Sequence, residues 1–346
     1  AMDGFAVRAA DVGRLPVELT LVGASHAGRW PDLRLGPGQC ASISTGAPLP
    51  QGADMVVMVE HTTQLPGSRV RVERLSGHNV CPMGEDIRQG QLVLRAGQEL
   101  TALRVGVAAS AGYDRLRVFR RPTIALLCTG TEVVEPGEPV QRGQIYNSNG
   151  PILRALLTPL SASLEYLGIA GDQEDDLQEA VRRGLKADVL VISGGVSVGR
   201  YDLVPSVLER LGVRILFREC AIRPGKPVLF GTRSGTCLFG LPGNPQSCFV
   251  VFHVLLRPAL AMMSGAGEIC PAYRTGLARV GFPNKPDRKH FVPCRVEVSE
   301  GLNYLTPVPC RGSADIMSAS AASAYLVVPQ GVERVEAGQR LLFFEV

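Results

Sequence analysis

Hydrophobic and polar residues alternate along the first part of the chain, in short stretches such as 17–22 and 54–59 that Pro/Gly turns separate. Alternation with a period of two is typical of strands that bury one face. Residues 5–88 are therefore predicted to form a β-rich region. The stretch 101–111 has a helical pattern, and Thr101 is suited to cap its start.

The pattern changes at Arg121, where continuous apolar runs begin to alternate with amphipathic segments. The apolar runs predict strands at 123–128, 163–169, 188–192, 213–217, 228–231 and 237–241. The other segments predict helices at 149–160, at 174–186, from about Pro205, and at 244–263, where the helix is largely apolar. This alternation predicts a central, doubly wound, mostly parallel α/β sheet, which binds ligands outside the carboxyl ends of its strands.

Short strands return after Gly265, with Pro/Gly turns between them. They are predicted at 275–281, 291–298, 323–328 and 341–346, and they favour a small β barrel or sandwich. We therefore expect an N-terminal region (1–120) that contains the β-rich part, an α/β domain (121–264) and a C-terminal β-barrel domain (265–346).

The composition limits the classes of function. The chain has 346 residues, of which 45% are hydrophobic, which is enough for several domains with their own cores. The net charge is +4 without a long Lys/Arg run, so an anionic ligand is permitted and nucleic acid is not indicated. The longest apolar stretch, 248–263, is interrupted by His253, Arg257 and Pro258, so no membrane span is predicted.

Nine cysteines stand singly, without a CxxC pair, and several lie inside apolar runs, as Cys128 and Cys248 do. This spacing predicts reduced and mostly buried thiols in a cytoplasmic protein. The five histidines lie far apart in the sequence, so a zinc site is not expected.

The loop after the predicted strand 188–192 combines small and polar residues before a helical pattern, namely Ser193, Gly194, Gly195, Ser197, Gly199 and Asp202. Glycines between a strand and a helix let backbone N–H groups approach an anion, and the helix N-terminus adds partial positive charge. Asp202 would repel a phosphate unless Mg²⁺ lay between them. The alternative is a tight turn in which Asp202 lies near the helix cap.

Other predicted strands also end in polar loops. Glu132, Asp172 and Asp202 would gather at one sheet edge, where Asn147 and Ser148 also begin a helix. Carboxylates at such an edge suit a Mg²⁺ ion that holds phosphate oxygens. Alternatively, each acid is a solvated loop residue or a helix cap.

Two proline-flanked turns complete the set of candidates. The turn 223–227 places Arg223 and Lys226 on a stiff backbone, which suits a fixed oxyanion, although an exposed turn with solvated cations has the same pattern. The turn 241–245 contains Pro242, Asn244 and Pro245, and it either contacts substrate or simply caps the long helix.

Taken in order, these motifs resemble the molybdopterin molybdenumtransferase family, which includes bacterial MoeA and the E domain of gephyrin. The resemblance covers nearly the whole chain, through the motifs at 1–8, 44–48, 52–54, 84–87, 129–132, 193–199, 224–227, 241–245 and 312–316. It implies an enzyme that takes adenylylated molybdopterin and molybdate, cleaves the adenylate with the help of Mg²⁺, and releases AMP and molybdenum cofactor.

The resemblance also implies partners. The family forms an elongated homodimer in which the α/β domain faces the N-terminal region of the other subunit. Other enzymes of molybdenum-cofactor biosynthesis are candidate partners, and the cytoplasm is the expected compartment. The chain begins at Ala1, so we expect a preceding segment to complete the elongated domain.

Carried over residue by residue, the resemblance assigns roles to the candidates. The expected catalytic residues are Asp3, Thr45, Asp86, Glu132 and Lys226. The expected Mg²⁺ ligands are Asp172 and Asp202. The expected substrate-binding residues are Asn147, Ser148, Gly194, Gly195, Ser197, Arg223, Pro242, Asn244, Pro245, Arg288 and Ser318. Among all these residues, Arg223 and Lys226 match the cations that bind molybdate in the family.

Two residues depart from the family pattern: Thr131 stands where Asp or Asn is usual, and Pro293 stands where a second Arg is often found. Two rival functions are considered. An adenylyltransferase that uses ATP shares the α/β domain, but it usually lacks flanking β regions. A gephyrin-like scaffold would have a vestigial site, but the acids and Lys226 are retained here. Molybdate and tungstate are nearly isosteric, so the sequence does not separate them.

Overall fold

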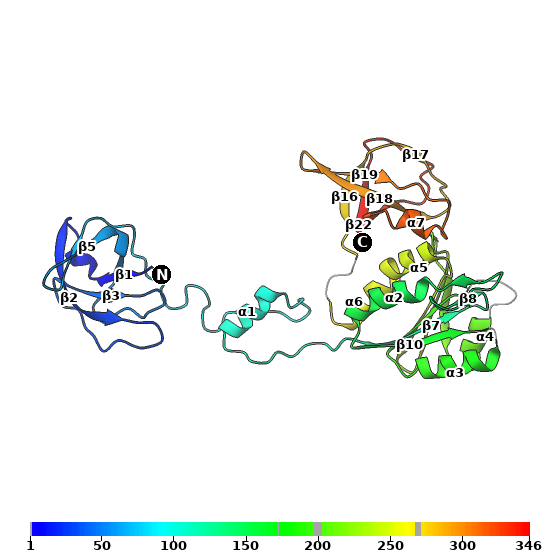
Figure 1. Cartoon of the computed structure of the whole chain (residues 1–346), viewed down its shortest axis with the longest axis horizontal. Helices are drawn as coiled ribbons and strands as arrows, with labels where there is room; N and C mark the ends of the chain where they lie inside the picture. The colour runs from blue at the N-terminus through cyan, green and yellow to red at the C-terminus, as the bar shows by residue number, and fades with distance from the viewer. Residues whose placement is uncertain (1, 172, 197–202, 267–270) are drawn as a thin grey trace. The chain divides into compact units, whose positions relative to one another are not determined.

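The computed structural model describes residues 2–171, 173–196, 203–266 and 271–346 (Figure 1). The described chain divides into two compact units, Ala1–Leu94 with Val107–Gly112 and Arg95–Gly106 with Tyr113–Val346. The predicted Mg²⁺ ligands Asp172 and Asp202, and the predicted binding residue Ser197, lie outside the described residues.

The first unit is built on a six-stranded sheet with the order β4-β1-β3-β2-β6-β5. Its strands are β1 (Gly4–Val7), β2 (Val17–Ser25), β3 (Gln39–Ile43), β4 (Met55–Met58), β5 (Thr62–Leu65) and β6 (Arg69–Val72). This confirms a β-rich region, but residues 73–88 contain no helix or strand. They are mostly polar and exposed, and they contact the sheet through Val80, which packs against a cluster that includes Val56, and through the His78 oxygen, which accepts the Val56 N–H. Helix α1 (Ala102–Ser110) matches the helix predicted at 101–111.

The second unit contains a six-stranded sheet with the order β10-β7-β11-β15-β14-β12. Its strands are β7 (Thr123–Thr129), β10 (Ser163–Ala170), β11 (Val189–Ser193), β12 (Arg214–Glu219), β14 (Pro227–Arg233) and β15 (Thr236–Leu241). The first four strands of the order are parallel, whereas β14 and β12 add an antiparallel edge. The predicted mostly parallel sheet is confirmed, and the antiparallel edge is a common extension of such sheets.

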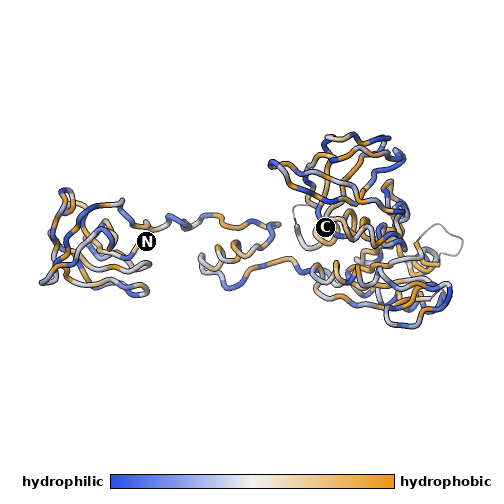
Figure 2. Tube along the Cα trace, turned by 45° about the horizontal axis from the view of Figure 1, so that its top comes forward, coloured by the Kyte–Doolittle hydropathy of each residue, from blue (hydrophilic) through white to orange (hydrophobic). Residues whose placement is uncertain are grey.

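Helices cover both faces of this sheet (Figure 1). On one face, α3 (Glu174–Gly184) and α4 (Leu203–Arg210) pack on a cluster that includes Leu177, Val181 and Val207. On the other face lie α2 (Asn149–Leu157), α5 (Pro245–Val251) and α6 (Arg257–Met263). Figure 2 shows hydrophobic positions along these strands and helices, while many connecting loops are hydrophilic.

The helix predicted at 244–263 is present as Pro245–Met263, and a π-helical segment, Phe252–Leu256, joins its α-helical parts α5 and α6. This segment ends just before Pro258, which has no N–H to continue a regular ladder. Among the described residues, the stretch Pro245–Met263 is the one helix long and apolar enough to cross a membrane. Its Val250, Phe252 and Leu256 side chains are buried in the protein, as expected of a core helix.

The C-terminal strands form a closed barrel, as the sequence predicts. Five strands follow one another in the order β18-β19-β16-β22-β20, and a further pairing of β18 with β20 closes the ring. They are β16 (Arg274–Ala278), β18 (Lys289–Ser299), β19 (Leu302–Pro307), β20 (Ala324–Val328) and β22 (Arg340–Glu345). The two-residue strand β13 (Ile222–Arg223) pairs with β18, so a loop of the α/β part extends the barrel.

We expect Asp188→Asn to destabilise the second unit by about 2 kcal/mol at pH 7, since hydrogen bonds to a charged acceptor are lost. Asp188 accepts both Arg120 guanidinium bonds and the Thr123 N–H and O–H bonds. Arg120 lowers the pKa of Asp188. A folded-state pKa below the unfolded value means that this stabilisation is complete above about pH 4 and is lost as the pH falls through the folded-state pKa.

Urea unfolding of both proteins at pH 7 and at pH 3 measures this effect. The difference in the free energy of unfolding should shrink at pH 3. The exposed acid Glu297 on β18 provides the control, because Glu297→Gln should change little at either pH. A difference that is constant with pH would show that the Asp188 charge is not responsible.

Candidate active site

A cavity of about 1130 Å³ opens at the carboxyl ends of the parallel strands. Ser193, the last residue of β11, lies level with Cys128 of β7 and with Leu241 of β15. The loops that follow these three strands therefore meet at one edge, as expected for a doubly wound sheet. The barrel supplies the remaining wall through residues of 288–293 and 308–316.

The loop after β11 can form only because it contains glycines. Gly194 has φ +93°, and a Cβ atom there would lie 2.6 Å from the Thr129 backbone oxygen. Gly195 has φ +63°, and its Cβ atom would lie 2.8 Å from both Thr129 Oγ1 and Val204 Cγ2. The Gly194 N–H donates to the Leu241 oxygen at 3.0 Å. The sequence thus allows backbone from three strand ends to approach closely beside the cavity.

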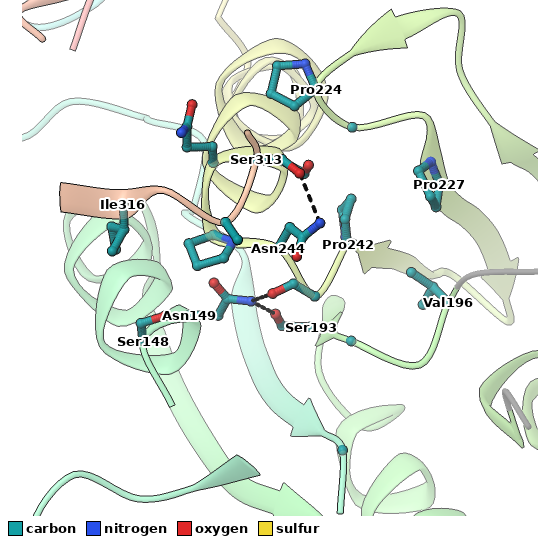
Figure 3. A pocket seen from close by; sticks show the side chains of 18 of the residues that line it. Ser148, Asn149, Ser193, Val196, Pro224, Pro227, Pro242, Asn244, Ser313 and Ile316 are labelled. Carbon is teal, nitrogen blue, oxygen red and sulfur yellow. Dashed lines mark hydrogen bonds between the residues drawn. The ribbon is translucent and has the colours of Figure 1, made fainter. Parts of the chain in front are cut away.

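Asn149 fixes the floor of the cavity (Figure 3). Its Nδ2 atom donates to Ser193 Oγ at 3.0 Å and to the Gly243 oxygen at 2.8 Å. The first turn of α2 is thereby tied to the ends of β11 and β15. Its Oδ1 atom is buried and accepts no hydrogen bond from the described residues. A ligand donor or a water molecule in the cavity could satisfy this oxygen.

The neighbouring residue Asn147 has a structural network of its own. Its Oδ1 atom accepts the Gly150 N–H at 2.8 Å, and its Nδ2 atom donates to the Tyr166 hydroxyl at 3.0 Å. The hydroxyl in turn donates to Glu135, and burial together with this bond raises the pKa of Tyr166. Asn147 therefore holds the start of α2 in place, while Ser148 beside it lines the cavity.

The turn before α5 is bound to the barrel. Asn244 Nδ2 donates to Ser313 Oγ at 2.9 Å, a contact that Figure 3 shows. Gln246 is buried, and its Nε2 atom donates to the Gly312 and Asp315 oxygens, each at 2.8 Å. These bonds hold the 312–315 loop over the start of α5 and so fix the barrel side of the cavity.

Arg223 is anchored to the barrel rim. Its Nη2 atom donates to Asn284 Oδ1 at 2.8 Å and to the Lys285 oxygen at 3.1 Å, and it lies 3.0 Å from His290 Nδ1. Its Nη1 atom lies 3.5 Å from an Asp287 oxygen. Burial lowers the pKa of Arg223, but a guanidinium keeps its charge throughout the physiological range.

Two further cations line the cavity and have acidic neighbours. Lys226 Nζ lies 3.3 Å from a Glu219 oxygen, and both side chains are about half exposed. Arg288 Nε donates to Asp287 at 2.9 Å, and this bond lowers the pKa of Asp287. Because an exposed ion pair is weak, an incoming anion can replace Glu219 as the partner of Lys226.

We expect Glu219→Gln to tighten the binding of molybdate or inorganic phosphate about threefold, because Lys226 no longer has to exchange partners. Calorimetric titration at low ionic strength measures this change. Glu209→Gln, which removes an exposed acid paired with Arg218, is the matched control and should leave the affinity unchanged. Equal affinities for Glu219→Gln and the unchanged protein would show that the pair does not compete with the ligand.

Most of the predicted site residues in the second unit line this one cavity. They are Glu132, Asn147, Ser148, Gly194, Gly195, Arg223, Lys226, Pro242, Asn244, Pro245 and Arg288. Ser318 lies apart, in a depression beside Arg311 and Asp315, and its N–H donates to Asp315 Oδ1 at 3.0 Å. The structure thus brings together segments that are distant in the sequence.

The remaining predicted catalytic residues lie in the first unit. Thr45 donates its backbone N–H to Asp3 Oδ1 at 2.7 Å, so these two predicted residues are in contact. Asp86 is exposed in a stretch without helix or strand. Their roles stay predictions.

The magnesium site also stays a prediction. Among the described residues, no group of three or more His, Cys, Asp and Glu side chains could hold a metal ion. Both predicted ligands lie outside this part of the chain. Their described neighbours Gly171, Val196 and Leu203 do line the cavity, and so does Glu132.

Several residues of the cavity are not among the predicted site residues, namely Asn149, Gln246, His290 and Ser313. Ser313 lies within the 312–316 motif, so that motif was a usable signal. His290 lies at the start of β18, in a polar stretch that precedes the predicted strand 291–298 and looks like an ordinary surface loop in the sequence. Pairing of β13 with β18 turns this stretch into a cavity wall.

Family models match nearly the whole chain. The MoeA N-terminal region (domain I and II) matches residues 1–112, the probable molybdopterin binding domain matches 125–262, and the MoeA C-terminal region (domain IV) matches 275–344. The molybdopterin molybdenumtransferase of Bacillus subtilis (strain 168) is 33% identical over 350 residues, which cover 97% of this chain and 81% of that protein. The chain belongs to the molybdopterin molybdenumtransferase family.

Other members are similarly related. The molybdopterin molybdenumtransferase of Haemophilus influenzae is 33% identical over 98% of this chain and 85% of its own length. A crystal structure of the molybdopterin biosynthesis MoeA protein from Pyrococcus horikosii has a TM-score of 0.80 and 31% identity, and covers 99% of this chain and 86% of that one. The family and the fold expected from the sequence motifs are therefore confirmed.

Proposed function

We propose that this protein is a molybdopterin molybdenumtransferase, which inserts molybdate into adenylylated molybdopterin and releases AMP. Family membership over nearly the whole chain carries the proposal. The cavity supports it, because glycine backbone and cations at the strand ends suit a ligand with several anionic groups.

The reaction requires little covalent chemistry from the protein. A phosphoanhydride-like bond between two anionic halves is broken, so neutralisation of charge and positioning supply most of the catalysis. The Gly194 N–H already donates to the Leu241 oxygen, so the Gly195 N–H would be the donor of this loop to a phosphate oxygen. Arg223 and Lys226 would bind molybdate from the other side of the cavity, with Arg288 as a further cation beside them. Glu132 would orient a polar group of the pterin or a water molecule.

The proposal includes further elements from the sequence. Asp172 and Asp202 would hold Mg²⁺, which would neutralise phosphate charge when bound. Asp3, with Thr45, and Asp86 would act from the second subunit of a homodimer and position water or a molybdate oxygen. Ser318 would contribute from the barrel. The protein would work in the cytoplasm and would exchange its small anionic substrates with other enzymes of the pathway.

One assay tests the proposal. The protein is mixed with adenylylated molybdopterin and Mg²⁺, and AMP is measured with and without molybdate or tungstate. Release of AMP that depends on the oxyanion is expected. Consumption of ATP with release of pyrophosphate would instead indicate an adenylyltransferase, and absence of both activities would leave a scaffold as the better account.

A further inference from the structure

Arg288 lines the cavity with a guanidinium group that is held on one side only. Its Nε atom donates to Asp287 Oδ2 at 2.9 Å, and its Nη1 atom donates to the Ile222 oxygen at 3.4 Å. Its Nη2 atom has no partner among the described residues. Because a guanidinium is planar and rigid, bonds on one side fix the direction in which the remaining N–H groups point.

Asp287 contacts the cations without entering the cavity. Among the described residues that line the cavity are Arg223 and Arg288, but not Asp287. Its Oδ2 atom accepts the Arg288 bond, and its Oδ1 atom lies 3.5 Å from Arg223 Nη1. The Arg288 bond lowers the pKa of Asp287, so the carboxylate is ionised at neutral pH. The cavity side of Arg288 is therefore left to a ligand.

The segment that carries Asp287 is itself fixed to the barrel. Hydrogen bonds of 2.7 to 3.1 Å join residues 284–287 to residues 330–333, and one of them is donated by Gln330 Nε2 to the Asp287 backbone oxygen. Asn284 also accepts a bond from Arg223. A group held in this way can orient its neighbour, because its own position costs little entropy to maintain.

We propose that Asp287 is a positioning residue, whose carboxylate holds the Arg288 guanidinium so that its Nη2 group donates to an oxyanion in the cavity. The contact with Arg223 is longer, and hence weaker, so Asp287 acts mainly through Arg288. The identity of the ligand rests on the proposed function, and an oxygen of molybdate or of a phosphate group has the required chemistry.

The sign of one effect tests this role. A negative charge near an anion site repels the ligand, so removing Asp287 should tighten binding if charge alone mattered. We expect Asp287→Ala instead to weaken binding about fivefold, because Arg288 is no longer oriented. Asp287→Asn keeps one acceptor for Arg288 Nε and should lose less. Glu333→Gln is the control, because Glu333 is an exposed acid whose backbone oxygen accepts the Asn284 N–H, and this change should not weaken binding.

A double-mutant cycle shows whether Asp287 acts through Arg288. Arg288→Met should weaken binding about tenfold, because a charged donor to the anion is lost. In the Arg288→Met background, Asp287→Ala should cause no further loss, since the group that it positions is absent. Unchanged affinity of Arg288→Met, or equal losses from Asp287→Ala in the two backgrounds, would overturn the proposed role.

Titration calorimetry with molybdate alone and with inorganic phosphate alone measures these affinities, and thermal unfolding checks that each variant is folded at the temperature of the titration. Unchanged or tighter binding by Asp287→Ala would overturn the positioning role, and so would failure of the unchanged protein to bind either anion. The result is distinct from that of the proposed function, because binding is measured without turnover. Absence of oxyanion-dependent AMP release by the unchanged protein rejects the function but leaves the binding measurements valid.

Discussion

Replacing Gly194 by alanine should lower the free energy of unfolding of the second unit by about 3 kcal/mol. Two costs add. The backbone has φ +93°, which an L side chain rarely adopts, and the new methyl group would lie 2.6 Å from the Thr129 oxygen. Because that oxygen belongs to the backbone at the end of β7, it cannot move without displacing the loops of the cavity. Binding of anions should therefore be lost as well.

Gly235 is a matched control for this substitution. It has nearly the same φ, +92°, but a Cβ atom there would have no neighbour within 4 Å. Gly235→Ala should therefore lower the free energy of unfolding only by the cost of the backbone conformation, about 1 kcal/mol, and should still bind anions. Urea unfolding and titration with inorganic phosphate measure both quantities. If the two variants lost equal stability, close contact at Gly194 would not be the cause.

Removing the charge of Lys226 should have the largest effect on catalysis. Lys226→Met keeps the length of the side chain, and it should lower kcat/KM for AMP release about 100-fold, as expected for loss of one group that stabilises developing negative charge. Its Glu219 partner would be left near the cavity as an unpaired negative charge, which adds repulsion.

A second lysine provides the control for this experiment. Lys186 is exposed and does not line the cavity, so Lys186→Met should keep full activity. Raising the salt concentration should lower the activity of the unchanged protein more than that of Lys226→Met, because only the unchanged protein has the Lys226 charge for salt to screen. If kcat/KM of Lys226→Met fell by less than threefold, Lys226 would have no part in the reaction.

The central sheet could be predicted because its strands are buried on both faces. A continuous apolar run such as 188–192 has few alternatives, and β11 (Val189–Ser193) differs from the prediction by one residue. The gathering of Glu132, Gly194, Lys226 and Asn244 at one cavity follows from the rule that parallel strands end at the same edge.

The barrel wall of the cavity could not be predicted in the same way. Strand β13 has two residues, which is too short to show any periodicity, and its partner His290 lies 67 positions later. The π-helical segment at Phe252–Leu256 has no hydrophobic pattern that separates it from an α-helix. Such features depend on contacts between distant segments, and a single sequence does not record those contacts.

The cavity is lined by both the parallel sheet and the C-terminal barrel. One side consists of loops of the parallel sheet and the other of loops of the barrel, and the side chains of Arg223, Asn244 and Gln246 link them. A ligand that contacts both sides would act as a non-covalent cross-link, whose binding energy is lost when either side melts. Saturation with substrate should therefore make barrel and sheet melt as a single cooperative unit.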